Sequence, residues 1–223
     1  MTLMILIALS FVMTFAALVY LLFKDLKGEK FGEKVKNAVK KNIWLIVYLA
    51  LCFCVSIGLS IVLEKVYIAN TLISNMKVIT LFCLLETVAV TDMREHIIPN
   101  KIILAGVFFR VCYAVAELLT LEGAYFDILK GDLYSIGLVV VLFILGVLVI
   151  KNGIGMGDIK LIFVMGIFQG ITGIISSLFM SLVASFFVAV AMLIAKKKTR
   201  KDAMAFAPSV LVGTAVSMFL TGM

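Results

Sequence analysis

The sequence contains few of the residues that a metalloenzyme or a Ser–His hydrolase needs. Histidine occurs once, at His96, which we interpret as a loop residue, and none of the four cysteines forms a CxxC pair. Neither a zinc knot nor a disulfide framework is indicated, and we expect no metal and no cofactor. All four cysteines fall within hydrophobic stretches, where we expect buried structural thiols: Cys52, Cys54, Cys83 and Cys112.

Charged residues are also scarce, at 15%, whereas 64% of the 223 residues are hydrophobic and the mean hydropathy is +1.21. Soluble domains are nearer to half apolar, so this composition indicates a membrane protein. Several stretches have the roughly 20 residues that a helix needs to cross a bilayer. Four of them are uncharged, Leu3–Phe23, Ile43–Leu63, Leu133–Ile150 and Ala203–Met223, and two contain charges, about Thr71–Thr91 and Ile102–Leu121.

The 35 uncharged residues of Leu161–Ala195 are too many for one crossing of a hydrocarbon core of roughly 30 Å. Two short helices that turn near Gly170–Gly173 would fit. The prediction is then an all-α polytopic membrane protein with about eight transmembrane helices and both termini non-cytoplasmic. Sixteen of the twenty Lys and Arg residues then lie in cytoplasmic segments, as the positive-inside rule requires: 24–42, 92–101, 151–160 and 196–202.

The net charge of +7 therefore lies mostly on one face of the membrane. This fits attraction to anionic lipid, and we expect no nucleic-acid partner. In the basic loop 24–42, apolar residues recur every four positions among lysines, which predicts a short interfacial helix. The first hydrophobic segment lacks a basic n-region and a cleavage site, so we expect it to be retained as a helix. We expect residues 1–223 to form a single transmembrane domain.

Two polar clusters border the predicted spans. Asp92 follows the third span in "TDMREHIIPN", and Asp158 begins the sixth in "GMGDIK". The predicted topology brings both carboxylates to the same depth at the cytoplasmic face. Alone, Asp158 could cap its helix and Asp92 could be a solvated loop charge. The glycines at 153, 155 and 157 weigh against a simple cap, because they let an extended peptide approach the carboxylate closely.

Together these clusters resemble a known family. Asp92 followed by Ile98-Pro99-Asn100, with the run Gly155–Lys160 two spans later, resembles the type IV prepilin peptidases, GxGD-type aspartyl proteases of the membrane. The stretch Ala205–Gly213, "AFAPSVLVG", is similar to the C-terminal motif of that family, with Ala205 in place of its usual proline. The resemblance covers about residues 76–214.

The resemblance implies that Asp92 and Asp158 form the catalytic pair. It also implies removal of the leader peptide from prepilin-like substrates (Flp/Tad pilins, pseudopilins or preflagellins), typically before their hydrophobic helix, at the cytoplasmic face of the plasma membrane. Many members also N-methylate the product and carry a tetracysteine zinc module in the first cytoplasmic loop. Since loop 24–42 contains no cysteine, we expect neither zinc nor S-adenosylmethionine to be required. The sequence does not indicate the oligomeric state.

Peptide hydrolysis independently suits such a pair, because two close carboxylates that share a proton can act as base and acid. Other polar residues have two interpretations each. Lys160 can favour an ionised Asp158 or anchor its helix, and Asn100 can bind substrate or cap the fourth span. The remaining candidate site-shaping residues are Gly155, Gly157, Pro99 and Pro208, of which Pro208 either exposes backbone groups near the site or kinks the last span.

Intramembrane charges support a second hypothesis, a proton- or ion-coupled transporter that uses Asp92, Asp158 and Glu86. Transporter carboxylates usually lie near the midplane between repeated halves, whereas the two aspartates border spans and the halves do not repeat. A third hypothesis is a non-catalytic assembly subunit. Within the bundle we also predict an ion pair between Glu86 and Arg110.

Overall fold

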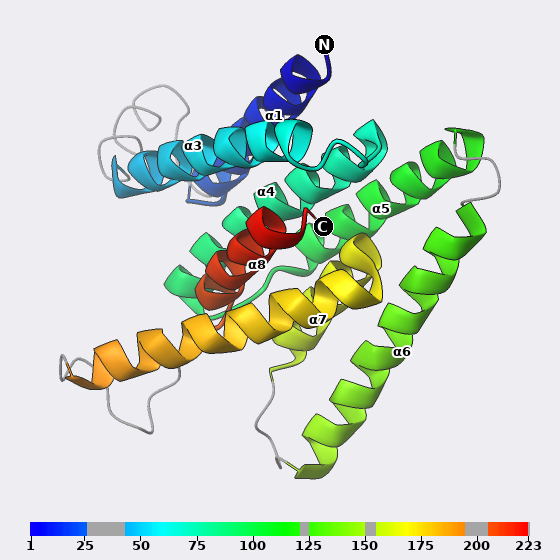
Figure 1. Ribbon diagram of the computed structural model, residues 1–223. Coiled ribbons are helices and arrows are strands. Elements are labelled where there is room, and N and C mark those ends of the chain that lie inside the picture. Colours follow the sequence, from blue (N-terminus) through cyan, green and yellow to red (C-terminus); the bar gives the residue numbers. More distant parts are fainter. Residues whose placement is uncertain (26–42, 121–124, 150–154, 195–204, 223) are drawn as a thin grey trace.

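The computed structural model describes residues 1–25, 43–120, 125–149, 155–194 and 205–222. Within these ranges the chain is all α-helical, without a β-strand, so the predicted class is confirmed there. Figure 1 shows the arrangement of the helices. They are α1 (Thr2–Asp25), α3 (Ile43–Lys65), α4 (Leu72–Glu95), α5 (Asn100–Thr120), α6 (Tyr125–Val149), α7 (Met156–Ile194) and α8 (Ala207–Thr221).

Five of the described helices are long and apolar enough to cross a membrane: α1, α3, α4, α5 and α7. α8 is apolar but has only 15 residues. α6 starts at Tyr125, earlier than the predicted Leu133, because its first turns accommodate charges and Asp127 pairs with Lys130 one turn later at 3.1 Å. The predicted interfacial helix in 24–42 and the basic segment 196–202 lie outside the described residues, apart from the end of α1.

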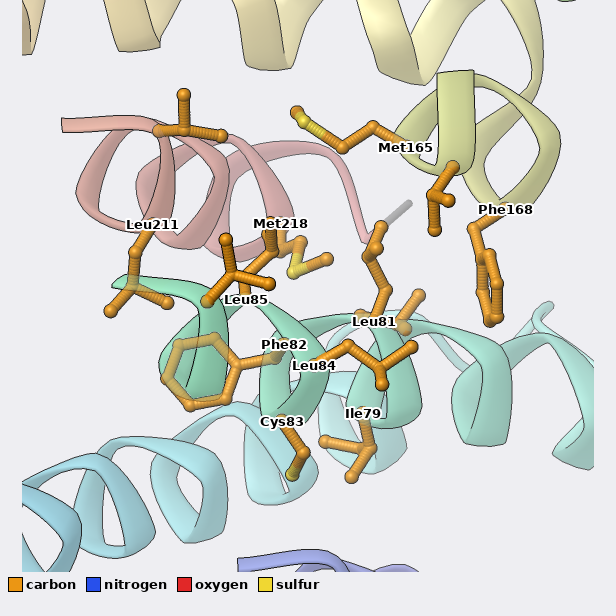
Figure 2. Close-up of a cluster of buried hydrophobic side chains, with 14 of the residues drawn as sticks. Ile79, Leu81, Phe82, Cys83, Leu84, Leu85, Met165, Phe168, Leu211 and Met218 are labelled. Carbon is orange, nitrogen blue, oxygen red and sulfur yellow. The ribbon is translucent and has the colours of Figure 1, made fainter. Parts of the chain in front are cut away.

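α4 lies at the centre of the bundle, between α1 and α3 on one side and α7 and α8 on the other (Figure 1). In its membrane-length stretch 83% of the residues are buried. Figure 2 shows Ile79 and Cys83 directed toward α3, and Leu81 and Leu85 directed toward α8 and α7. Because lipid tails are as apolar as these side chains, close packing rather than escape from water holds such helices together. α4 therefore forms the framework on which the other helices are positioned.

α7 is interrupted at Gly170, whose φ of 67° and ψ of −175° are not helical. Its two arms, residues 156–169 and 171–194, run in different directions (Figure 1). A positive φ is readily adopted by glycine and rarely by other residues. The break lies where the sequence predicted a turn within Leu161–Ala195.

A buried charge network ties α4, α5, α6 and α7 together. Arg110 on α5 bonds Glu117 at 3.0 Å and also pairs with Asp132 on α6. Lys77 on α4 contacts the other oxygen of Glu117 at 2.6 Å. The Arg110 Nε donates to the Ile167 carbonyl at 2.6 Å, in the last turn before the α7 break, where carbonyls lack intrahelical partners. Two positive and two negative charges leave the buried cluster neutral, which limits its desolvation cost.

The predicted pair between Glu86 and Arg110 is wrong. Arg110 is occupied by acidic side chains from α5 and α6. Glu86 is fully buried in α4, and neither of its carboxylate oxygens has a hydrogen-bond partner among the described residues. The sequence alone could not show which carboxylate pairs with Arg110, because helix periodicity does not specify which helices are neighbours.

The prediction of four buried thiols is also partly wrong. Cys52 and Cys83 are buried, whereas Cys54 and Cys112 are exposed on the described helices. Cys52 and Cys54 lie two positions apart on α3, which places them about 200° apart around the helix axis. One of two such residues therefore faces the bundle while the other faces outward.

The contact between α7 and α8 depends on Gly213. A Cβ on Gly213 would lie 2.2 Å from the backbone nitrogen of Ser181 and 2.3 Å from its Cα. The two helices therefore touch backbone to backbone at this point, and the Ser181 hydroxyl is directed toward the Val210 carbonyl at 3.4 Å. Small residues allow such approaches between membrane helices. This gives Gly213, the last residue of the "AFAPSVLVG" stretch, a structural role.

Candidate active site

Asp92 lies in the last turn of α4, which continues to Glu95 and does not stop at Thr91 as the sequence predicted. His96 ends the helix in the left-handed conformation (φ 51°, ψ 35°), and its N–H donates to the Asp92 carbonyl at 2.9 Å. The prediction was wrong because a polar turn was interpreted as a loop, whereas a helix can extend by a polar turn beyond its apolar span. The Asp92 side chain is buried, with 6% of its surface exposed.

The start of α8 contacts the Asp92 carboxylate. The backbone N–H of Ala207 donates to Asp92 Oδ2 at 2.9 Å in a buried position. Ala207 is the first residue of α8, and Pro208 follows it, so Pro208 lies in the first helical turn and not within a kink. Proline is favoured there because the first amides of a helix have no intrahelical acceptor. The free amide of Ala207 is thus available to orient Asp92.

Asp158 lies in the first turn of α7 and is half-buried. Its backbone N–H and that of Ile159 both donate to the Gly155 carbonyl, at 3.0 and 3.3 Å. A Cβ on Gly155 would lie 3.0 Å from Asp158 Oδ2, so the glycine leaves room beside the carboxylate. Gly153 lies outside the described residues.

Gly157 allows the segment after α4 to pack against the start of α7. A Cβ on Gly157 would lie 3.2 Å from the Cβ of Ile98 and 3.4 Å from its Cγ1. Ile98 is buried and immediately precedes Pro99, whose carbonyl accepts from Ile102 N at 3.1 Å at the start of α5. The "IPN" and "GxGD" motifs are therefore in direct contact.

A second contact links the same motifs through side chains. Lys160 Nζ donates to Asn100 Oδ1 at 2.9 Å, and both residues are exposed. This bond connects the starts of α5 and α7 and does not decide between the two interpretations offered for either residue. It also leaves the amide group of Asn100 free to donate.

Asp92 and Asp158 line one cavity of about 380 Å³. Among the other predicted residues, Gly155, Gly157, Lys160 and Asn100 also line this cavity, while Pro208 lines a neighbouring one. Two carboxyl groups that line one cavity can bind a water and move its protons. In the part of the chain that the structure describes, no three metal-ligating side chains gather at a spacing that would hold a metal ion.

Several residues that line the cavity were not predicted as site residues, Phe206 and His96 among them. Phe206 lines it just before α8, and His96 lines it at the end of α4. The "AFAPSVLVG" stretch, though similar to a family motif, carried no signal that its backbone would contact Asp92. The lone histidine was assigned to a loop because no other metal-binding or nucleophilic residue accompanied it.

The sequence is similar to one family of known proteins. Residues 79–194 match the model of the type IV leader peptidase family. Over 132 residues the chain is 29% identical to a prepilin leader peptidase/N-methyltransferase of Bacillus subtilis (strain 168), which covers 59% of this chain and 50% of that protein. The chain thus spans about half the length of this curated relative. No solved structure matches the present chain. Since the family model covers more than half of the sequence, the chain belongs to the type IV leader peptidase family.

Proposed function

We propose that this protein is an aspartyl endopeptidase of the plasma membrane that removes the leader peptide from prepilin-like membrane proteins. The observation that carries the proposal is the cavity shared by Asp92 and Asp158, in a chain of the leader peptidase family. The relative named a prepilin leader peptidase supports the substrate class. A Flp/Tad pilin, a pseudopilin or a preflagellin would each fit this class.

In the proposed mechanism the two carboxyl groups share one proton and bind a water between them. The ionised carboxylate removes a proton from the water, and the water oxygen bonds to the carbonyl carbon of the scissile peptide. The protonated carboxyl group donates its proton to the carbonyl oxygen, which gives a neutral gem-diol. The carboxyl group that received the water proton then protonates the departing amine, while the other carboxylate takes a proton from one hydroxyl of the gem-diol. The C–N bond breaks, a carboxylic acid and an amine are released, and the dyad again shares one proton.

The neighbouring residues have positioning roles in this proposal. The Ala207 amide orients Asp92, and the glycines around Asp158 leave space for an extended peptide backbone. The free Asn100 amide can donate to a substrate carbonyl at the rim of the cavity. Pro99 begins the α5 turn that positions Asn100.

We place the cavity at the cytoplasmic face, in a bundle of eight membrane-crossing segments in which the two arms of α7 count separately. The charge bias of the sequence supports this orientation, and the basic segments would face anionic lipid. The position of both aspartates at helix ends, and not midway along helices, favours the peptidase over a transporter.

The test is cleavage of a purified prepilin by purified protein in detergent. Asp92→Asn and Asp158→Asn should each abolish product formation while the proteins remain folded, because each removes one member of the proton-sharing pair. Asp127→Asn is the matched control, since Asp127 is an exposed aspartate on α6. Near-normal turnover by either dyad variant would reject the aspartyl mechanism. Absence of cleavage by the wild type across the three substrate types would reject the peptidase.

A further inference from the structure

A second cavity lies beside the first, and we call it the α7–α8 groove. It begins beyond the backbone contact of Gly213 with Ser181, along the later residues of α7 and the first residues of α8. The groove between them has a volume of about 760 Å³. It is lined by Met93, His96, Ala184, Phe187, Val188, Met192, Ala205, Pro208, Ser209 and Val212.

The groove adjoins the cavity of the two aspartates. His96 lines both cavities. Along the chain, Phe206 lines the aspartate cavity, while Ala205 and Pro208 on either side of it line the groove. A chain segment bound between the aspartates would therefore reach the groove directly.

The lining and the length of the groove suit a bound helix. Its walls are mostly apolar side chains of α7 and α8, with Met93 and His96 from the end of α4. The small residues Ala184, Ala205 and Ser209 permit close approach of another backbone. Phe187 and Val212 are 65% and 56% exposed, so both have surface that a partner could cover. Along α7 the lining runs from Ala184 to Met192, about 12 Å at 1.5 Å per residue. That length matches about two turns of a bound helix.

We propose that the α7–α8 groove binds the first turns of the membrane-embedded apolar helix that adjoins the scissile bond of the substrate. The inference rests on the proposed function and adds a second recognition element to it. The extended peptide around the scissile bond occupies the aspartate cavity, and the apolar helix continues into the bilayer along α7 and α8. The groove thus selects substrates in which an apolar helix starts directly beside the cleavage site.

The test compares two substrates in detergent: a prepilin with its leader and apolar helix, and a synthetic peptide that spans the leader and cleavage site but lacks the helix. The readout is the ratio of kcat/KM for the prepilin to kcat/KM for the peptide. Ala184→Trp fills the groove and Phe187→Ala removes one wall, so each should lower this ratio about tenfold, mainly through KM for the prepilin.

Phe186→Ala is the matched control, because Phe186 is adjacent to Phe187 and equally exposed, at 64%, but does not line the groove. This variant should keep the wild-type ratio. A photo-crosslinking residue at position 187 should capture the prepilin, and one at position 186 should not.

Three results would overturn the inference. Equal loss on both substrates would mean that the groove acts only through the shape of the aspartate cavity. An unchanged ratio in both groove variants would mean that lipid or another part of this chain fills the groove. Wild-type protein that cleaves neither substrate would refute the proposed function itself, whereas cleavage with unaltered ratios refutes the groove alone.

Discussion

Asp92 and Asp158 reach their shared cavity from opposite helix ends, the last turn of α4 and the first turn of α7. Their relative position therefore depends on how closely these two ends approach. Gly157 and Ile98 form that approach, with a separation at which a Cβ on the glycine would press on the Ile98 side chain. Residue 157 thus acts on the dyad through packing and not through chemistry.

We predict that Gly157→Ala lowers kcat/KM for the prepilin. The added Cβ would press on Ile98 at 3.2 Å, and a mild overpacking of about 1 kcal/mol corresponds to roughly fivefold in rate. The closest atom is the Ile98 Cβ, which every residue except glycine carries, so truncating Ile98 to alanine would not remove this contact. Cleavage kinetics of the Gly157→Ala variant measure the effect.

Gly137→Ala is the control for this prediction, since a Cβ at Gly137 on α6 would meet nothing within 4 Å. It should leave both kcat/KM and thermal stability at wild-type values. If Gly157→Ala is as active as Gly137→Ala, the contact between the two motifs does not set the dyad geometry.

At the scale of helices, the sequence predicted much of what hydropathy and glycine chemistry control. The first four described helices begin within two residues of the predicted spans, and the break in α7 falls at Gly170. The end of α4 and the partners of Arg110 were not predicted. A polar last turn resembles a loop in sequence, and an intramembrane arginine can pair with a carboxylate on any neighbouring helix.

The two aspartates of the candidate site were predicted from the sequence, but the backbone contact to Asp92 was not. Family motifs singled out Asp92 and Asp158, and the structure brings both to one cavity. The bond from the Ala207 amide to Asp92 could not be predicted, because backbone donors have no sequence signature. It depends on where α8 begins and on how closely α8 packs against α4.

The packing of α8 gives a prediction for helix association. Gly213→Ala should destabilise the protein by more than the roughly 1–3 kcal/mol typical of overpacking, because the Cβ would meet backbone atoms of Ser181 that cannot change rotamer. Thermal unfolding in detergent measures the loss. Truncating the Ser181 side chain should not restore stability. Gly58→Ala is the control, since its Cβ would meet only Phe219 at an ordinary 3.8 Å; equal stability of the two variants would contradict the backbone contact.

At the scale of the whole molecule, α4 connects two polar regions of different kinds. Lys77 belongs to the neutral charge network near its start, and Asp92 belongs to the candidate active site near its end. Fifteen residues separate them, about 22 Å along the helix axis, which is most of a hydrocarbon core of roughly 30 Å. In the proposed topology the network lies toward one face of the membrane and the two aspartates toward the other. The proposed peptidase needs water at these aspartates, and a position at the membrane rim would supply it.

This arrangement predicts which sites are labelled from each side of the membrane. Ile68 precedes α4 and is 81% exposed, while Lys101 follows α4 and is exposed at the start of α5. With the four native cysteines replaced, Ile68→Cys should react with an impermeant maleimide on intact cells, and Lys101→Cys only after permeabilisation, because basic segments stay cytoplasmic. Labelling of both variants in permeabilised cells is the control for thiol reactivity. Labelling of Lys101→Cys on intact cells would place the dyad outside, and labelling of both from one side would mean that α4 does not cross.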